Sequence, residues 1–202
     1  MVSVAMPTPD ASSMLQPMAD RWTSADLAHL PDNGIRYEVL NGQLIVNAAP
    51  KPRHQELLTW LLIALTSAMP QDHWVLPGVG VLIGDDEPIP DLVAGRGAVD
   101  KDERGVHAEQ VDLAVEIVSA STTLQDRMVK PIVYAQAGIP NYWRIEINSF
   151  KGRLPGEDLP VLFAYALNED NEYELVQRAA AGAEVTLHAP FEFTVDPKTL
   201  LR

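Results

Sequence analysis

The sequence predicts one domain of the α/β (α+β) class, in which buried strands pack against helices. Residues 90–94 and 111–119 are near-continuous apolar runs interrupted by acids, which is typical of strands covered on both faces. Residues 52–69 repeat leucine at helical spacing and predict an amphipathic helix. An Asn-Gly pair between two apolar segments predicts a hairpin before that helix.

Length and composition indicate a single folded unit. The chain has 202 residues, 47% of them apolar, which is enough for one domain with a substantial core. Residues 1–20 are rich in Pro, Ser and Met without periodicity, so we expect a loose tail there and one domain over 21–202. That tail holds no Lys or Arg and does not resemble a secretory signal, and the apolar tract 57–69 is shorter than the roughly 20 residues that span a bilayer.

Cysteine and charge content narrow the function classes. The chain has no cysteine, which excludes disulfides and thiolate metal sites and favours a reducing compartment, so we expect a cytoplasmic protein. Fifteen basic and 28 acidic residues give a formal net charge of −13. This charge argues against broad attraction to nucleic acid, unless a local basic face or bound divalent cations offset it.

The first predicted elements are a short helix and the hairpin. Thr23 and Asp26 have the spacing of a helix cap, and the helix is expected to run to Leu30. In the hairpin, strands 36–40 and 43–46 flank the two-residue turn, and this register pairs Glu38 with Ile45. Glu38 is therefore an acid on an apolar strand.

The helix over 52–69 has apolar residues beyond its leucine stripe, so we expect it to be covered on most sides, with a homodimer interface as one way of covering it. His54 lies in its first turn. The sequence leaves two interpretations of His54 open, a surface or capping histidine and a site residue near the sheet edge.

Short strands and charged turns are expected between this helix and the strand 111–119. Residues 74–84 contain Pro77 and two glycines and predict two short strands or one bent one. The acids of 85–88 are expected to be solvated, and the mixed charges of 95–110 predict a solvent-facing loop. On the strand 111–119, Asp112 and Glu116 share a face but lie roughly 13 Å apart at strand rise, too far to share one ion.

A second helix is predicted over 124–137, after hydroxyl residues that suit a cap. Asp126, Lys130 and Tyr134 are spaced four residues apart and would share one face of it. Pro131 predicts a kink at Lys130. Further strands are expected at the positions 141–147, 161–167, 173–177 and 184–187, the last three as an antiparallel extension.

Asp91, Glu116 and Lys130 are the candidate reactive residues. Two close carboxylates repel each other unless a divalent cation neutralises both, and oxygen ligands favour Mg²⁺ or Mn²⁺. A lysine beside them suits phosphodiester hydrolysis, because it orients water or stabilises charge on a phosphoryl group. The spacing equally allows a structural interpretation in which Asp91 is a turn acid, Glu116 pairs with Arg127 or Lys130, and Lys130 is solvated.

An ordered set of motifs resembles the Uma2 (DUF820) family of the PD-(D/E)xK restriction-endonuclease-like superfamily. The motifs are RYEVLNGQL at 36–44, PDL at 90–92, DLAVEIVSAST at 112–122, Asp126-Arg127 with Lys130 and Tyr134, and AGIPNYW at 137–143. The resemblance implies a mixed central β-sheet flanked by helices, with an N-terminal hairpin and a C-terminal β extension. It also implies a metal-dependent endonuclease that acts on DNA.

Carried over by position, the resemblance makes Asp91 and Glu116 the Mg²⁺ (or Mn²⁺) ligands and Glu38 an auxiliary acid. The superfamily's lysine two places after the acid is absent, because Val118 stands there, and Lys130 matches a lysine supplied by the following helix. The supporting residues are then Ser119, which suits capping equally well, Asp126, which would hold Lys130 or Arg127, and also His54 and Tyr134.

Two other functions compete with the nuclease. A catalytically silent module that uses the nuclease fold for binding or assembly is favoured by Pro131, which would misplace the amine, and by the acidic net charge. A glycosidase with paired carboxylates is disfavoured, because aromatic residues make up only 6% of the chain and sugar sites usually stack on aromatic rings.

Overall fold

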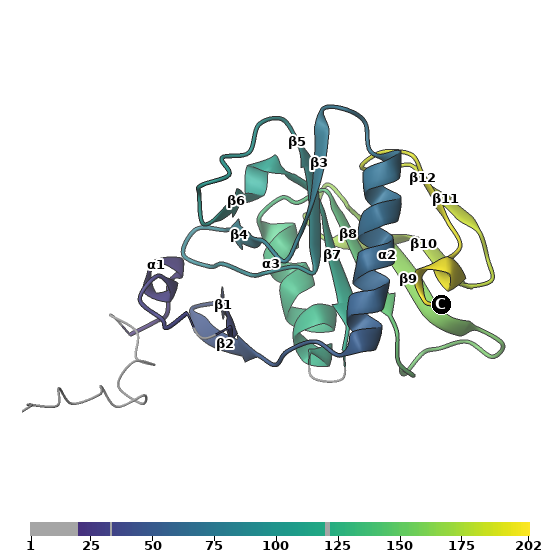
Figure 1. The fold of residues 1–202 in the computed structure, drawn as a ribbon, viewed down its shortest axis with the longest axis horizontal. Helices are drawn as coiled ribbons and strands as arrows, with labels where there is room; N and C mark the ends of the chain where they lie inside the picture. The colour runs from purple at the N-terminus through teal and green to yellow at the C-terminus, as the bar shows by residue number, and fades with distance from the viewer. Residues whose placement is uncertain (1–19, 33, 120–121) are drawn as a thin grey trace, which may run out of the picture.

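The computed structural model describes residues 20–32, 34–119 and 122–202, so the predicted tail lies outside it except for Asp20. Figure 1 shows helices α2 and α3 on opposite sides of a central sheet. The helices are α1 (Ser24–Leu27), α2 (Pro52–Ala68) and α3 (Lys130–Gln136), with 3₁₀ turns η1 (Ala108–Gln110) and η3 (Pro197–Leu200) and a π-helical segment η2 (Gln125–Val129). None of the helices within the described ranges has the length and apolarity needed to cross a membrane.

Six strands form the central sheet in the order β10-β9-β8-β7-β5-β3. Their bounds are β3 (His73–Pro77), β5 (Leu92–Arg96), β7 (Val111–Val118), β8 (Asn141–Glu146), β9 (Asp158–Leu167) and β10 (Tyr173–Ala181). Strands β7 and β8 are parallel and the other neighbours are antiparallel, so the sheet is mixed. The parallel pair is joined through η2 and α3, as parallel strands require a crossover.

Three two-stranded pairings complete the fold. They are the hairpin of β1 (Arg36–Leu40) with β2 (Gln43–Asn47), the parallel pair of β4 (Gly80–Leu82) with β6 (Gly105–His107), and the pair of β11 (Val185–Leu187) with β12 (Phe193–Val195). The hairpin has the predicted register, with Glu38 opposite Ile45, because Asn41 and Gly42 adopt the positive φ angles of the two-residue turn. Of the three strands predicted as a C-terminal extension, the first two are β9 and β10, which belong to the central sheet itself.

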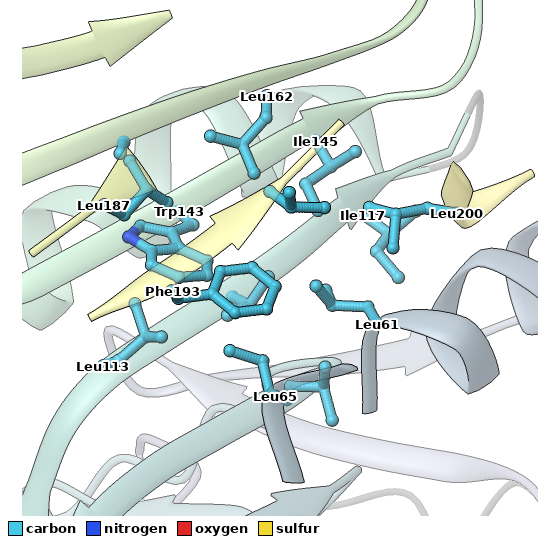
Figure 2. Packing of buried hydrophobic residues seen from close by; sticks show 14 of the residues in the cluster. Leu61, Leu65, Leu113, Ile117, Trp143, Ile145, Leu162, Leu187, Phe193 and Leu200 are labelled. Carbon is cyan, nitrogen blue, oxygen red and sulfur yellow. The ribbon is translucent and has the colours of Figure 1, made fainter. Parts of the chain in front are cut away.

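Alternate residues of β7 face two separate apolar clusters. Leu113, Val115 and Ile117 pack on the side of α2, whereas Ala114 packs on the side of α3. Figure 2 shows the α2 side, where leucines of α2 point at the stacked rings of Trp143 and Phe193. Because both faces are covered, the strand is apolar almost throughout, and Glu116 lies in the interior on the α3 side.

Several local predictions were wrong. Helix α1 ends at Leu27 instead of Leu30, although Asp26 caps it by accepting from the Thr23 amide at 2.8 Å. The segment 95–110 contains β6 and η1, so it is not a simple loop. Glu87 is buried, and both its carboxylate oxygens accept from Arg104 Nε, at 2.8 and 2.9 Å, so it is not a solvated acid.

Pro131 does not displace Lys130 from helical geometry. Lys130 has φ −59° and ψ −42°, and Pro131 follows the π-helical η2, which runs directly into α3. The backbone pairing shifts in η2, where the Asp126 carbonyl accepts from the Tyr142 hydroxyl. The irregularity lies earlier, in the π-helical turns of η2. The predicted kink is therefore replaced by a change of helix type just before Lys130.

Truncation of the α2 stripe tests this packing. Leu61 is fully buried between α2 and the sheet, so Leu61→Ala is expected to lower the free energy of unfolding by about 2–5 kcal/mol through lost transfer energy and a residual cavity. Ile63→Ala on the same helix is the matched control, since Ile63 is 48% exposed and its loss is expected to be within about 0.5 kcal/mol. Urea denaturation measures both, and equal losses would contradict the assigned buried face of α2.

Candidate functional site

Carboxylates from three separate strand regions meet at one cavity of about 520 Å³. Glu38 comes from β1, Asp91 directly precedes β5, and Glu116 lies on β7. Seven of the eight predicted site residues line this cavity, namely Glu38, His54, Asp91, Glu116, Ser119, Asp126 and Lys130. The eighth, Tyr134, reaches it through a hydrogen bond to Glu116. The sequence-predicted residues therefore form one site.

The Lys130 ammonium lies at the centre of the acids. Its Nζ is 3.0 Å from Glu116 Oε1 and 3.2 Å from Glu38 Oε2, and it donates to the Ile89 carbonyl at 3.3 Å. Burial alone lowers the pKa of Lys130, but Glu116, Glu38 and the other neighbouring carboxylates outweigh it and raise that pKa. Lys130 is consequently a fixed cation and not a solvated helix residue.

Asp91 is held by a strand amide and by the first turn of α2. Its Oδ2 accepts from the Ile117 amide at 2.7 Å and lies 3.2 Å from His54 Nε2. His54 is therefore buried beside Asp91 and is not a surface histidine. Burial lowers the pKa of His54, while the hydrogen bond and charge of Asp91 raise it, and the net shift is upward. Within the described chain, Asp91 Oδ1 accepts no hydrogen bond.

Glu116 is fully enclosed except on its cavity side. Tyr134 donates its hydroxyl to Glu116 Oε1 at 2.7 Å, so this oxygen is shared between Tyr134 and Lys130. Burial raises the pKa of Glu116 well above its ordinary value, and Asp126, Asp91 and Glu38 raise it further against the opposing effect of Lys130. Among the described residues, the contacts of Glu116 with Tyr134 and Lys130 both fall on Oε1.

The hairpin brings Glu38 to the site through backbone pairing with the segment before β5. Val39 and Glu87 exchange two backbone hydrogen bonds at 3.2 and 3.0 Å. Glu38 then accepts from the Ile89 amide at 3.0 Å through Oε2 and from Asn47 of β2 through Oε1. Ile89 thus binds the site acid with its amide and the site lysine with its carbonyl.

Asp126 faces Lys130, and Arg127 belongs to another ion pair. Asp126 Oδ1 is 3.9 Å from Lys130 Nζ, one helical turn away, while Arg127 binds Glu146 at 2.7 Å. Burial raises the pKa of Asp126 to about 7 against the opposing effect of Lys130. The Ser119 amide and hydroxyl interact with Thr122, which supports capping, although Ser119 also lines the cavity.

The donor set suits a hard divalent cation, with carboxylate oxygens as ligands. Four carboxyl groups, Glu38, Asp91, Glu116 and Asp126, surround one ammonium and one histidine, so acidic groups outnumber basic ones. Asp91 and Glu116 are each held through one oxygen, Oδ2 and Oε1 respectively, and both residues line the cavity. Within the described ranges, no group of three or more His, Cys, Asp or Glu side chains is already spaced around an ion. The residues fit such an ion in chemistry, with Lys130 occupying part of the space between the acids.

Some contributors to the site were not predicted from the sequence. The Ile89 and Ile117 backbone groups and the Asn47 amide hold the acids, and only Asn47 at the hairpin end carries a side-chain signal. A larger cavity of about 830 Å³ lies on the other side of Ile89, lined by Trp74, Leu76, Glu87, Val99, Arg104 and Val106 among others. It contains none of the predicted site residues, so the smaller cavity is the candidate site.

A mixed sheet flanked by helices, with an acid and lysine cluster beside its parallel strand pair, defines a nuclease-like α/β protein. The crystal structure of a putative nuclease belonging to DUF820 from Anabaena variabilis ATCC 29413 has this fold, with a TM-score of 0.64 and 19% sequence identity over 88% of this chain and 96% of that chain. The chain belongs to the Uma2 family, described as "Putative restriction endonuclease", whose model matches residues 24–198. No curated protein matches the chain.

Removal of the central cation tests the electrostatics of the site. Lys130→Met keeps the length of the side chain but leaves buried carboxylates unpaired, so it is expected to lower the free energy of unfolding by about 3–5 kcal/mol near neutral pH. The loss should shrink toward pH 5, because Asp126, with a pKa of about 7, is then protonated and needs no counter-ion. The double variant Lys130→Met/Glu116→Gln should recover part of the loss. A loss independent of pH in urea denaturation would contradict the assigned ion pairs.

The raised pKa of Asp126 predicts a pH-dependent stability. Its pKa is about 7 in the folded chain against an ordinary 3.8, so its contribution to folding is fully present below about pH 4 and is lost as pH rises to 7. In Asp126→Asn this loss is absent, so the variant should gain stability relative to the wild type from pH 4 to 7. Above pH 7 the curves of unfolding free energy against pH should run parallel for the two proteins. Denaturation at half-unit pH steps measures the difference, and parallel curves throughout the range would contradict burial of a titrating Asp126.

Proposed function

We propose that this protein is a metal-dependent endonuclease that hydrolyses phosphodiester bonds of DNA. Asp91 and Glu116 hold Mg²⁺ or Mn²⁺, Glu38 supports the same centre, and Lys130 acts on the reacting phosphate and water. The membership of the chain in a family of restriction-endonuclease-like nucleases supports the reaction class. We place the enzyme in the cytoplasm, and we propose that it works as a homodimer in which each copy acts on one strand.

One observation carries the proposal. A buried ammonium contacts two carboxylates from different strands at 3.0 and 3.2 Å, beside a third carboxylate whose Oδ1 accepts no hydrogen bond from the described residues. A purely structural ion pair needs one acid, and burying further acids beside it is unfavourable. An excess of carboxylates at a cavity is the arrangement that a divalent cation and a phosphate would stabilise.

The side chains divide the work of hydrolysis. Water adds its oxygen to phosphorus, one phosphorus–oxygen ester bond breaks, and the water proton leaves to a carboxylate or to solvent while the sugar oxygen gains one. Lys130 remains protonated, because its pKa is raised by the carboxylates, so it stabilises negative charge on the phosphoryl oxygens and orients water but does not accept a proton. A divalent cation, when bound, supplies Lewis-acid polarisation and a lower pKa for water.

The remaining residues position these groups. His54 and the Ile117 amide fix Asp91 Oδ2 and leave Oδ1 toward the cavity. Tyr134 fixes Glu116 Oε1 in the same way. Each carboxylate is thereby oriented by one occupied oxygen, which restricts its rotation before any ligand binds.

Calorimetric titration with Mn²⁺ and Mg²⁺, followed by cleavage of plasmid and of labelled oligonucleotides, tests the proposal. The wild type is expected to bind metal and to cut, and Asp91→Asn or Glu116→Gln should each lose at least tenfold in metal affinity and most cleavage. Binding should also release protons, measurable as a dependence of heat on buffer, because Glu116 has a raised pKa. Asp112→Asn is the control, since Asp112 lies on the same strand but pairs with Arg96.

Two results would contradict the proposal. Absence of metal binding by the folded wild type would leave the catalytically silent binding or assembly module as the function. Metal binding that survives at both Asp91→Asn and Glu116→Gln would place the ion elsewhere.

A further inference from the structure

Three basic side chains on the outer part of the candidate site form no ion pair with the described residues. Arg36 opens β1, and Lys51 and Arg53 flank the first residue of α2. All three are exposed and line the cavity that contains the acids. None of them forms an ion pair with any residue in the described parts of the chain, whereas Arg104, which is also exposed, is paired with an acid.

The cavity therefore has acids and one lysine in its buried part and basic side chains at its exposed opening. Glu38, Glu116 and Lys130 are at most 4% exposed, and Asp91 is 9% exposed. The rim, defined as Arg36, Lys51 and Arg53, is solvent-exposed and contains the charged residues of the exposed lining, all of them basic. In a chain of net charge −13, a group of unpaired cations at one opening produces a local positive potential that the total charge conceals.

A ligand with evenly spaced negative charges fits this arrangement. A nucleic-acid backbone offers one charge per residue, so one phosphate can enter the cavity while its neighbours remain on the rim. The rim can engage about three phosphates, which is a small electrostatic footprint.

Because the acids are deeply buried, the site favours a flexible single strand of DNA over a stiff duplex. A duplex is stiff over about 150 base pairs, and bringing one of its phosphates to a nearly inaccessible floor requires deformation of the duplex. A single strand bends at each nucleotide and can place one phosphate in a recess. The cavity, at about 520 Å³, lies within the range of small-ligand sites.

We infer that Arg36, Lys51 and Arg53 are the phosphate-binding rim that admits a single DNA strand, or a frayed end or flap, into the cavity. This inference rests on the proposed function and narrows its substrate class. The rim residues bind and position the substrate, and they take no part in the bond-breaking step.

Fluorescence anisotropy with a labelled 12-nucleotide strand and the matching duplex tests the inference. Ca²⁺ is supplied, because it also takes oxygen ligands and offsets the acids. The wild type is expected to bind the single strand at least fivefold more tightly than the duplex. The slope of log K against log salt should be about −2 for the single strand, and Lys51→Ala or Arg53→Ala should each weaken binding severalfold and reduce the slope by about 0.7.

Matched controls separate the rim from general charge. Lys198→Ala and Arg153→Ala remove exposed cations that lie outside the cavity lining and should leave affinity and slope unchanged. Equal effects of control and rim variants, or no effect of either, would overturn the rim assignment. Duplex binding as tight as single-strand binding would overturn the substrate class.

The two proposals fail in different ways. Metal-dependent cleavage that is unaffected by the rim variants would leave the nuclease in place and reject the rim. Rim-dependent binding of a single strand by a protein that neither binds metal nor cuts would retain the rim and reject the nuclease.

Discussion

The interaction on which the site depends is the burial of the Lys130 ammonium among carboxylates that arrive from separate parts of the chain. Glu38 comes from the hairpin, Glu116 from the middle of the sheet and Asp126 from the preceding helical turn. Each of these acids would be unfavourable in its own apolar setting without a cation. The lysine therefore couples the hairpin, β7 and the crossover helix, and no one of these elements can move far without exposing an unpaired charge.

The crossover between β7 and β8 sets the position of that lysine. Because the two strands are parallel, the chain must return along the sheet, and α3 does so across the face that carries Glu116. The buried residues of this crossover include Asp126, Lys130 and Tyr134, one on each successive turn, and all three contact the site. A lysine supplied by this helix thus reaches the acid that a strand lysine at position 118 would have served, while Val118 remains an apolar sheet residue.

The sequence predicts those parts of the molecule that depend on local chemistry. The Asn-Gly turn determines the hairpin register, and the four-residue spacing of Asp126, Lys130 and Tyr134 determines their shared face. The resemblance of ordered motifs to a known family selects Asp91 and Glu116 from the many acids of the chain. Their assembly into one site follows from the fold, whereas their role as metal ligands stays a prediction.

Long-range pairing and backbone donors escaped prediction for a physical reason. Glu87 looks like a turn acid until β4 and β6 pair and bring Arg104 to it, 17 residues away. The two interpretations of His54 differ only in whether the first turn of α2 lies at Asp91. Pro131 predicts a kink from its own stereochemistry, but η2 changes the helix type just before it and Lys130 keeps helical angles. Each outcome is decided by tertiary placement that no local pattern contains.

The backbone of Ile89 sets the spacing between two charged groups of the site. Its amide and its carbonyl bind Glu38 and Lys130, and prolines with fixed φ angles stand on both sides of it. The separation between hairpin acid and helix lysine is thus set by the orientation of two adjacent peptide groups and is indifferent to the side chain at position 89. That side chain is left free to form the partition between the two cavities, so its size can vary without altering the spacing of the charges.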